Sequence, residues 1–244
     1  MIRIAMWSGP RNISTALMRS FENRDDCVVV DEPLYAHYLA VTGLDHPAAE
    51  QVIAAGDTDW RRVTEWLSTG TPGGADPTAA ICYQKHMTHH LLPHITYDWI
   101  HRLRNVLLIR DPREVVASYV KSRATVTPKD IGLPQQVALY EALAPVGGPP
   151  PVIDAADFLR DPEGHLRALC DLFEVPFTDR MLSWPAGPRD SDGVWAPYWY
   201  EAVRRSTGFE PYRPRNPRLD GEPARTAQAC LPHYGRLRAV RLRP

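Results

Sequence analysis

Five short, almost uninterrupted apolar runs recur along the chain, and they limit the folds that it can adopt. Each run has the length of a strand and lacks the apolar–polar alternation of a strand with one face in water. A strand that is apolar throughout must be covered on both faces, as in a parallel sheet flanked by helices. The runs are residues 2–7, 27–30, 79–83, 105–109 and the stretch around 152–153.

Segments with helical periodicity separate these runs. Apolar residues recur three or four positions apart in 13–21, 60–67 and 112–120, and again in 154–173. This alternation predicts an α/β fold: a three-layer structure with a central, mostly parallel sheet of about five strands joined by right-handed crossovers. The length of 244 residues fits a single domain over residues 1–244.

Three segments depart from the alternation. Residues 42–78 and 124–150 are rich in Gly, Pro, Thr and Ala, a composition that predicts excursions from the sheet rather than separate domains. Residues 185–217 combine Pro, Arg and aromatic side chains. We expect them to form an irregular C-terminal lid or a segment wrapped over the surface.

Polar residues follow four of the expected strands at the points where these end. They include arginines, a lysine and carboxylates. Because the carboxyl ends of parallel strands share one edge, where open α/β sheets bind their ligands, we expect these residues to meet in one site. They are residues 8–11, 31–32, 84–86 and 110–111.

The loop after the first expected strand has the features of an anion site. It turns directly into a helix, whose N-terminal backbone N–H groups and dipole attract negative charge. Its arginine can bridge two oxygens, and its hydroxyl side chains are further donors. It lacks the lysine of a nucleoside triphosphate P-loop, so it favours a phosphate-sized anion without bound magnesium. The loop consists of Gly9, Pro10, Arg11, Asn12, Ile13, Ser14 and Thr15.

A second element lies at the end of the fourth expected strand. Arg110 ends the strand, and Ser118 follows it by eight positions on a helix that begins at Pro112. Together with the loop, this pair resembles the two signature elements of sulfotransferases that use 3′-phosphoadenosine 5′-phosphosulfate (PAPS). The resemblance implies a P-loop NTPase-like sulfotransferase fold. Residues 9–15 would hold the 5′-phosphosulfate, and Arg110 and Ser118 the 3′-phosphate.

The resemblance extends to residues that carry chemistry. It implies that Glu32, which stands 21 residues after Arg11, is the general base. It also implies that Lys85 and Arg11 support the leaving group; Lys85 is one of only three lysines among 28 basic residues. The implied reaction is in-line transfer of a sulfuryl group from PAPS to a hydroxyl or amine of a small-molecule acceptor, with PAP (3′-phosphoadenosine 5′-phosphate) as product.

His86 is the alternative base. Many cytosolic sulfotransferases use a histidine two residues after a lysine, whereas His86 follows Lys85 directly. If the strand continues, neighbouring side chains point to opposite faces, which favours Glu32 over His86. Pro33 is expected to hold Glu32 in an extended conformation on the ligand edge.

The sequence departs from the family pattern in two places. Asn12 and Ile13 replace the usual Ser-Gly of the loop, and Asp190 and Asp192 stand near the expected Arg-Lys-Gly element. Another arginine of the C-terminal part would then complete the 3′-phosphate site. The candidates are Arg189, Arg204, Arg205, Arg213 and Arg215.

Two other functions stay open at this point. Segments 27–32 and 106–111 are apolar and contain an aspartate at the end, as in a kinase or NTPase that binds magnesium. The departures in the loop and tail would also fit a sulfotransferase-like binding protein without turnover.

Composition argues against several further classes. A formal net charge of −1 offers no general attraction for nucleic acid or anionic membranes. No segment has the pattern of a signal peptide or a transmembrane helix, and the four cysteines have no CxxC spacing, so we expect a cytoplasmic protein. His86, His89, His90 and His94 match no strong zinc motif, and we expect no metal.

Overall fold

The five apolar runs form one parallel sheet in the computed structural model, which describes residues 1–71, 79–123 and 125–244. The strand order is β2-β3-β1-β4-β5, and each pairing is parallel. This confirms the predicted α/β fold with a central parallel sheet. The strands are β1 (Ile2–Ser8), β2 (Cys27–Asp31), β3 (Ile81–Met87), β4 (Arg104–Ile109) and β5 (Val152–Asp154).

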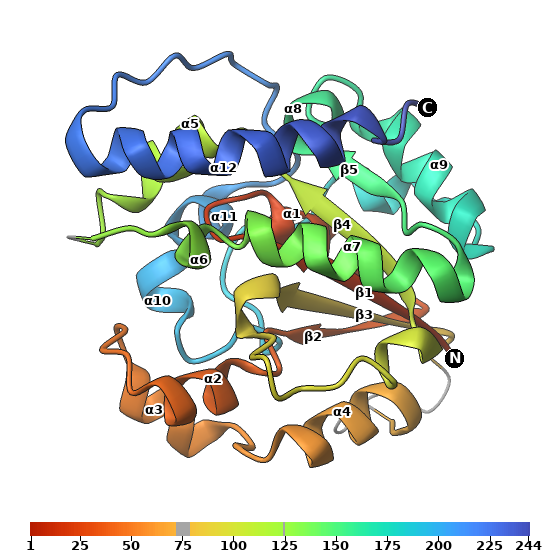
Figure 1. Cartoon of the computed structure of the whole chain (residues 1–244). Helices are drawn as coiled ribbons and strands as arrows, with labels where there is room; N and C mark the ends of the chain where they lie inside the picture. Colours follow the sequence, from red (N-terminus) through yellow and green to blue (C-terminus); the bar gives the residue numbers. More distant parts are fainter. Residues whose placement is uncertain (72–78, 124) are drawn as a thin grey trace.

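Helices connect the strands and cover the sheet (Figure 1). Among the described residues, none of them combines the length and the apolar character needed to cross a membrane. The α-helices are α1 (Ser14–Glu22), α2 (Tyr35–Thr42), α3 (Ala49–Ala55), α4 (Trp60–Thr69), α5 (Pro112–Tyr119), α6 (Pro128–Ile131), α7 (Leu133–Gly147), α8 (Ala155–Phe158), α9 (Pro162–Phe173), α10 (Ala196–Trp199), α11 (Glu201–Arg205) and α12 (Gly221–Ala239); short 3₁₀ turns are η1 (Thr88–His90), η2 (Ile100–Arg102) and η3 (Asp179–Leu182).

The central strand β1 shows why helices are needed on both faces of the sheet. Ala5 and Trp7 belong to one apolar core, Ile4 and Met6 to the other, and all four are fully buried. The first core includes residues of α4, α5, α7 and α12, and the second includes residues of α1, α9 and η3. Figure 1 shows α7 and α12 in front of the sheet. The near-continuous apolar character of β1 is therefore the sequence signature of a strand between two cores.

Two long helices of the first core were not predicted. α7 occupies much of the predicted excursion 124–150, and α12 lies in the tail; each has a proline inside, Pro145 and Pro232. Their buried apolar residues override the low helix propensity of proline and glycine. Residues 72–78 and 124 of the predicted excursions lie outside the described part of the chain.

Strand β3 is longer than the apolar pattern predicted. It continues past Tyr83 through Gln84, Lys85 and His86 to Met87, and each of these side chains is buried. The polar residues that were expected after the strand therefore lie within the sheet. Polar groups can be buried there because partners on neighbouring elements satisfy them.

Segment 185–217 wraps along α1 and α2. Trp195 and Tyr200 pack against Tyr35 of α2 in a third apolar cluster. At its start, Asp192 pairs with Arg19 of α1, whose Nη2 lies 2.5 Å from the Asp192 Oδ1 atom; only 1% and 3% of these side chains are exposed. A buried ion pair therefore fixes the start of this segment to α1.

We expect the substitution Asp192→Asn to lower the free energy of unfolding by about 3 kcal/mol, because breaking a buried ion pair leaves a charge without its partner. Glu22 also accepts from Arg19, at 3.0 Å, which keeps the loss near the lower end of the usual range. Urea unfolding measures it. Asp190→Asn is the matched control, because the Asp190 side chain is exposed; similar losses in both variants would contradict the prediction.

Candidate active site

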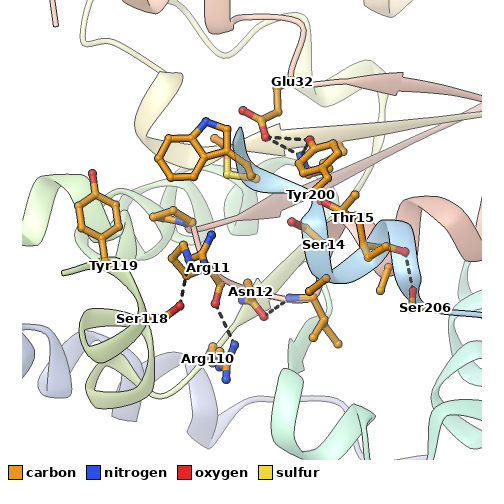
Figure 2. Close-up of a pocket in the computed structure, with 18 of the residues that line it drawn as sticks. Arg11, Asn12, Ser14, Thr15, Glu32, Arg110, Ser118, Tyr119, Tyr200 and Ser206 are labelled. Carbon is orange, nitrogen blue, oxygen red and sulfur yellow. Dashed lines mark hydrogen bonds and ion pairs between the residues drawn. The ribbon is translucent and has the colours of Figure 1, made fainter. Parts of the chain in front are cut away.

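A cavity of about 360 Å³ opens at the carboxyl edge of the sheet (Figure 2). Each of the four strand ends that the sequence singled out contributes to its lining: Arg11 after β1, Glu32 after β2, Lys85 from β3 and Arg110 after β4. The remaining walls come from α2, the end of α5 and the segment around α11. These residues thus lie together at one edge of the sheet, as the sequence predicts.

The loop after β1 presents free hydrogen-bond donors to the cavity. The backbone N–H groups of Ser14, Thr15 and Ala16 begin α1 and have no protein partner within the described residues. All three residues line the cavity. Unpaired N–H groups at a helix N-terminus, together with the helix dipole, form an anion site.

Asn12 compensates for the unusual loop sequence. Its Nδ2 donates to the Leu108 carbonyl at 3.2 Å, and its Oδ1 accepts from the Ile13 N–H at 2.8 Å. The Asn12 side chain thus joins the loop to β4. It also occupies the backbone N–H of Ile13, which is then no longer free to bind an anion. Pro10, Asn12 and Ile13 line the cavity as predicted binding residues.

Gly9 does not line the cavity, although we predicted that it binds the anion. A Cβ atom at this position would stand 2.3 Å from the carbonyl oxygen of Ile131. The glycine is needed because the loop passes directly under α6.

The two predicted phosphate elements contact each other. Nε of Arg11 donates to Oγ of Ser118 at 3.0 Å, and Nη1 of Arg110 donates to the Arg11 carbonyl at 2.9 Å (Figure 2). Arg110 also holds Glu114 with two hydrogen bonds, at 2.8 and 3.1 Å. Burial and the nearby charge of Arg110 lower the pKa of Arg11. An anion bound here would relieve this unfavourable environment.

A buried cluster of charges lies opposite the loop. The Lys85 ammonium, 1% exposed, contacts Oδ1 of Asp31 at 2.8 Å and Oε1 of Glu32 at 2.5 Å. Burial raises the pKa of Glu32, the charge of Asp31 raises it further, and Lys85 opposes the shift. Burial lowers the pKa of Lys85, but the two carboxylates outweigh this effect and raise it. Glu32 therefore has the raised proton affinity of a candidate base.

The backbone at Glu32 is not extended, contrary to the expectation from Pro33. Its φ is +41°, in the left-handed region. Two hydrogen bonds hold it there: its N–H donates to the Lys85 carbonyl at 2.9 Å, and its carbonyl accepts from the Tyr35 N–H at 3.0 Å. The first continues the pairing of β2 with β3, and the second turns the chain into α2. These bonds outweigh the extended preference of a residue before proline.

Sequence reasoning missed Tyr200, which completes the cluster. Its hydroxyl lies 2.6 Å from the Lys85 ammonium and 2.7 Å from Oδ2 of Asp31. The Trp195 indole N–H donates to the same hydroxyl at 3.1 Å. No motif distinguishes Tyr200 from Tyr198 in this aromatic segment; their exposed fractions, 5% and 55%, do.

His86 lies away from the cavity. It is 2% exposed and stacks on Trp7, with ring centroids 4.2 Å apart, and Nε2 of His86 lies 3.1 Å from Oε1 of Gln84. Burial and the charge of Lys85 lower the pKa of His86 to about 3. This geometry does not support His86 as the alternative base. Within the described ranges, no group of three or more His, Cys, Asp or Glu residues could hold a metal ion.

The arginines proposed to complete the 3′-phosphate site do not line the cavity. Arg204 lies 3.8 Å from Asp192, and Arg205 pairs with Glu201. Arg189 donates to the Pro185 carbonyl at 2.9 Å, while Arg213 and Arg215 are exposed.

Other arginines lie beside Arg110 instead. A second hollow of about 330 Å³ shares Arg110 and Leu159 with the cavity, and its lining includes Arg113, Arg160 and Arg238. These side chains were not identified from the sequence because they come from three separate helical regions.

Two solved structures resemble the whole fold. A sulfotransferase domain from the curacin biosynthetic pathway aligns over 93% of this chain and 96% of that chain, with a TM-score of 0.53 and 17% identity. A sulfotransferase domain from the Synechococcus PCC 7002 olefin synthase aligns over 94% of both chains, with a TM-score of 0.54 and 16% identity. At such identities the likeness concerns the fold alone.

Closer sequence relatives have longer chains. The branched-chain-amino-acid aminotransferase-like protein 2 of Arabidopsis thaliana is 37% identical over 238 residues, which cover 96% of this chain and 41% of the relative. The branched-chain-amino-acid aminotransferase-like protein 1 of the same species is 41% identical over 206 residues, which cover 84% of this chain and 36% of the relative. The chain thus spans about two fifths of the length of these relatives. The profile of the family described as "Sulfotransferase domain" matches residues 2–241, and the chain therefore belongs to the sulfotransferase family.

Proposed function

We propose that the protein transfers a sulfuryl group from PAPS to a hydroxyl or amine of a small-molecule acceptor. One observation carries this proposal: a single cavity joins an anion site with free N–H donors to a buried carboxylate of raised pKa beside a lysine. The first feature suits a phosphosulfate, and the second suits removal of a proton from the acceptor. The four cysteines are free, which supports the reducing, cytoplasmic setting that we propose.

The cavity offers PAPS two places for its anionic groups. The amides of Ser14, Thr15 and Ala16, with Arg11, would hold the 5′-phosphosulfate, and Arg110 with Ser118 would hold the 3′-phosphate. PAPS supplies an activated sulfuryl group, whose bond to the 5′-phosphate oxygen breaks as the acceptor oxygen or nitrogen bonds to sulfur. Arg11 and Lys85 would stabilise the charge that develops on the phosphate side.

Glu32 would take the proton of the acceptor. Its raised pKa makes it a stronger base once ionised, and the charge of Lys85 favours the ionised form. Asp31 accepts hydrogen bonds from Lys85 and Tyr200 and from the Gly193 N–H. We assign Asp31 a positioning role.

The competing kinase or NTPase function is less well supported. Of the two aspartates that imitate magnesium ligands, Asp31 is held by Lys85 and Tyr200. Asp111 accepts from the Arg113 N–H at 2.9 Å as the N-cap of α5 and pairs with the Arg113 side chain. A parent protein that binds PAP but transfers no sulfuryl group would favour the remaining alternative, a binding protein.

Arg110→Ala should weaken the binding of PAP by about tenfold or more, because a charge-assisted contact with the 3′-phosphate is lost. Adenosine 5′-phosphosulfate, which lacks that phosphate, should lose much less. Thermal shifts with each ligand in metal-free buffer measure both effects. Arg102→Ala, an exposed arginine on η2, is the control. Equal weakening of the two ligands would overturn the assignment of Arg110, and the absence of PAP binding to the parent protein would overturn the proposed function.

Glu32→Gln should lower the rate of transfer from PAPS by about 10²–10⁴-fold, because it keeps the shape of the side chain but cannot accept the proton. PAP binding should persist. Single-turnover transfer from radiolabelled PAPS to a panel of hydroxyl and amine acceptors measures the rate. Glu201→Gln, at an exposed carboxylate, serves as the matched control. A Glu32→Gln protein that works like the parent would show that Glu32 is not the base.

Tyr200→Phe should raise the pKa of Glu32, because the hydroxyl contact that favours its ionised form is removed. Asp31→Asn should lower it, because a negative charge leaves the cluster. Since the base acts when ionised, the acidic limb of kcat/KM should move to higher pH in the first variant and to lower pH in the second. Tyr198→Phe, at an exposed side chain, should leave the profile unchanged. Shifts in the same direction would contradict the assignment of Glu32 as the titrating base.

A further inference from the structure

One end of the cavity is lined by residues to which we assign no part in binding the anionic groups of the donor or in the transfer. It extends from Glu32 along the start of α2 to η1 and the end of α5. The wall begins next to the proposed base, since the Tyr35 N–H donates to the Glu32 carbonyl. A molecule bound here would therefore place its reacting group beside Glu32. The side chains of this wall are Tyr35, His46, His89, His90, Tyr119 and Arg123.

Most of the wall is aromatic and uncharged. The ring of His90 stacks between Tyr35 and Tyr38, with centroids 4.7 Å from each. The Tyr35 hydroxyl lies 2.8 Å from Nδ1 of His46. Burial lowers the pKa of His46 and of His89 to about 4, and it also lowers that of His90. These imidazoles are neutral at pH 7, so the wall favours a flat or apolar body.

Arg123 is the exception on this wall. Four cations line the whole cavity: Arg11, Lys85, Arg110 and Arg123. Lys85 and Arg110 have carboxylate partners within 4 Å. Within the described residues Arg11 and Arg123 have none; the Arg123 side chain donates from Nη1 to the Asp45 carbonyl at 2.8 Å and lies beside the Tyr119 hydroxyl. The carboxylate of Asp130, on the same side, is held by Thr127.

The charge of Arg123 is therefore available to a ligand in the same sense as that of Arg11, which we assign to the donor. A guanidinium has five N–H donors and binds carboxylates and phosphates in a fork. Two imidazole nitrogens add polar contacts. Nδ1 of His89 and Nδ1 of His90 are buried without a hydrogen-bond partner among the described residues, and the side chain of His90 is only 2% exposed.

The same charges decide which anion fits. A phosphate monoester is close to a dianion at neutral pH and calls for more than one cation. The histidines on this wall cannot supply a second cation, because their pKa values lie far below 7. A monoanionic carboxylate matches one arginine among neutral aromatic side chains.

The geometry points to a hydroxy acid as the acceptor: an apolar, preferably aromatic molecule that presents its hydroxyl to Glu32 and its carboxylate to Arg123. This inference rests on the proposed sulfuryl transfer and adds the class of the substrate. Arg123 would act as a specificity-determining residue that does not touch the reacting atoms.

Three phenols that differ mainly in charge test the inference: 4-hydroxyphenylacetate, its neutral amide, and the cation tyramine. Their dissociation constants are measured by calorimetry with and without PAP. The parent protein should bind the acid about 10- to 100-fold more tightly than the amide, as expected for one charge-assisted contact, and tyramine most weakly. 4-Hydroxyphenyl phosphate, as the dianionic arm, should bind less tightly than the acid.

Arg123→Gln should remove the preference for the acid and leave the binding of the amide and of PAP unchanged. Lys121→Gln is the matched control, since it removes a positive charge nearby from an exposed side chain that does not line the cavity. Equal affinities for acid and amide in the parent, no binding of the acid, or an equal effect of both substitutions would overturn the inference. If the parent protein binds 4-hydroxyphenyl phosphate more tightly than the acid, the carboxylate assignment is wrong and the acceptor carries a phosphate monoester instead. Failure of PAP to bind is a separate outcome that concerns the proposed function, because the charge series is also measured without PAP.

Discussion

The buried ammonium of Lys85 is the interaction on which the arrangement of this site depends. Removing a lysine from water costs several kcal/mol unless carboxylates and hydrogen-bond acceptors surround it. Asp31 and Glu32 provide the charges, and Tyr200 provides a hydroxyl. Three separate parts of the chain must therefore meet at one point: the end of β2, the interior of β3 and the segment that wraps along α1 and α2. One ammonium faces two carboxylates. Burial raises the pKa of Glu32 against the opposing charge of Lys85, and the charge of Asp31 adds to the increase.

The cavity has opposite electrostatic character on its two sides. Free amide donors and Arg11 line the loop side, whereas Glu32 and Lys85 line the other side, where Lys85 also contacts the buried Asp31. Such a division suits a reaction in which negative charge collects on a phosphate and a proton leaves in the other direction. The chain as a whole is almost neutral, with a formal net charge of −1. The attraction for an anionic donor is thus a local property of a helix terminus and a few arginines.

Local sequence patterns predicted those site residues whose positions are set by the strand, loop or helix that contains them. Arg11 and Arg110 were identified because strand, loop and helix follow one another in a short stretch, and Ser118 because its spacing from Arg110 resembles the sulfotransferase signature. Long-range packing decided the rest. The sequence predicts that the strand ends before the polar residues Gln84, Lys85 and His86. In the structure β3 continues through them, because partners from distant elements satisfy their polar groups. The rule of alternation did predict correctly that His86 would turn away from Lys85 in a continuing strand. Tyr200 and helix α12 could not be recognised, since only tertiary burial distinguishes them from an exposed, proline-rich tail.

Strained backbone occurs on both sides of the site. Arg11 and Glu32 both have a positive φ, +56° and +41°, which is costly for residues with a Cβ atom. Each is held by another residue of the site: Nη1 of Arg110 donates to the Arg11 carbonyl, and the Lys85 carbonyl accepts from the Glu32 N–H. Arg110 and Lys85 therefore each have two roles. Each contributes a positive charge to the site, and each makes a hydrogen bond to the backbone of a strained residue. Both strained residues line the same cavity. Each strained residue is thus held by a partner on its own side of the cavity, Arg11 by Arg110 and Glu32 by Lys85.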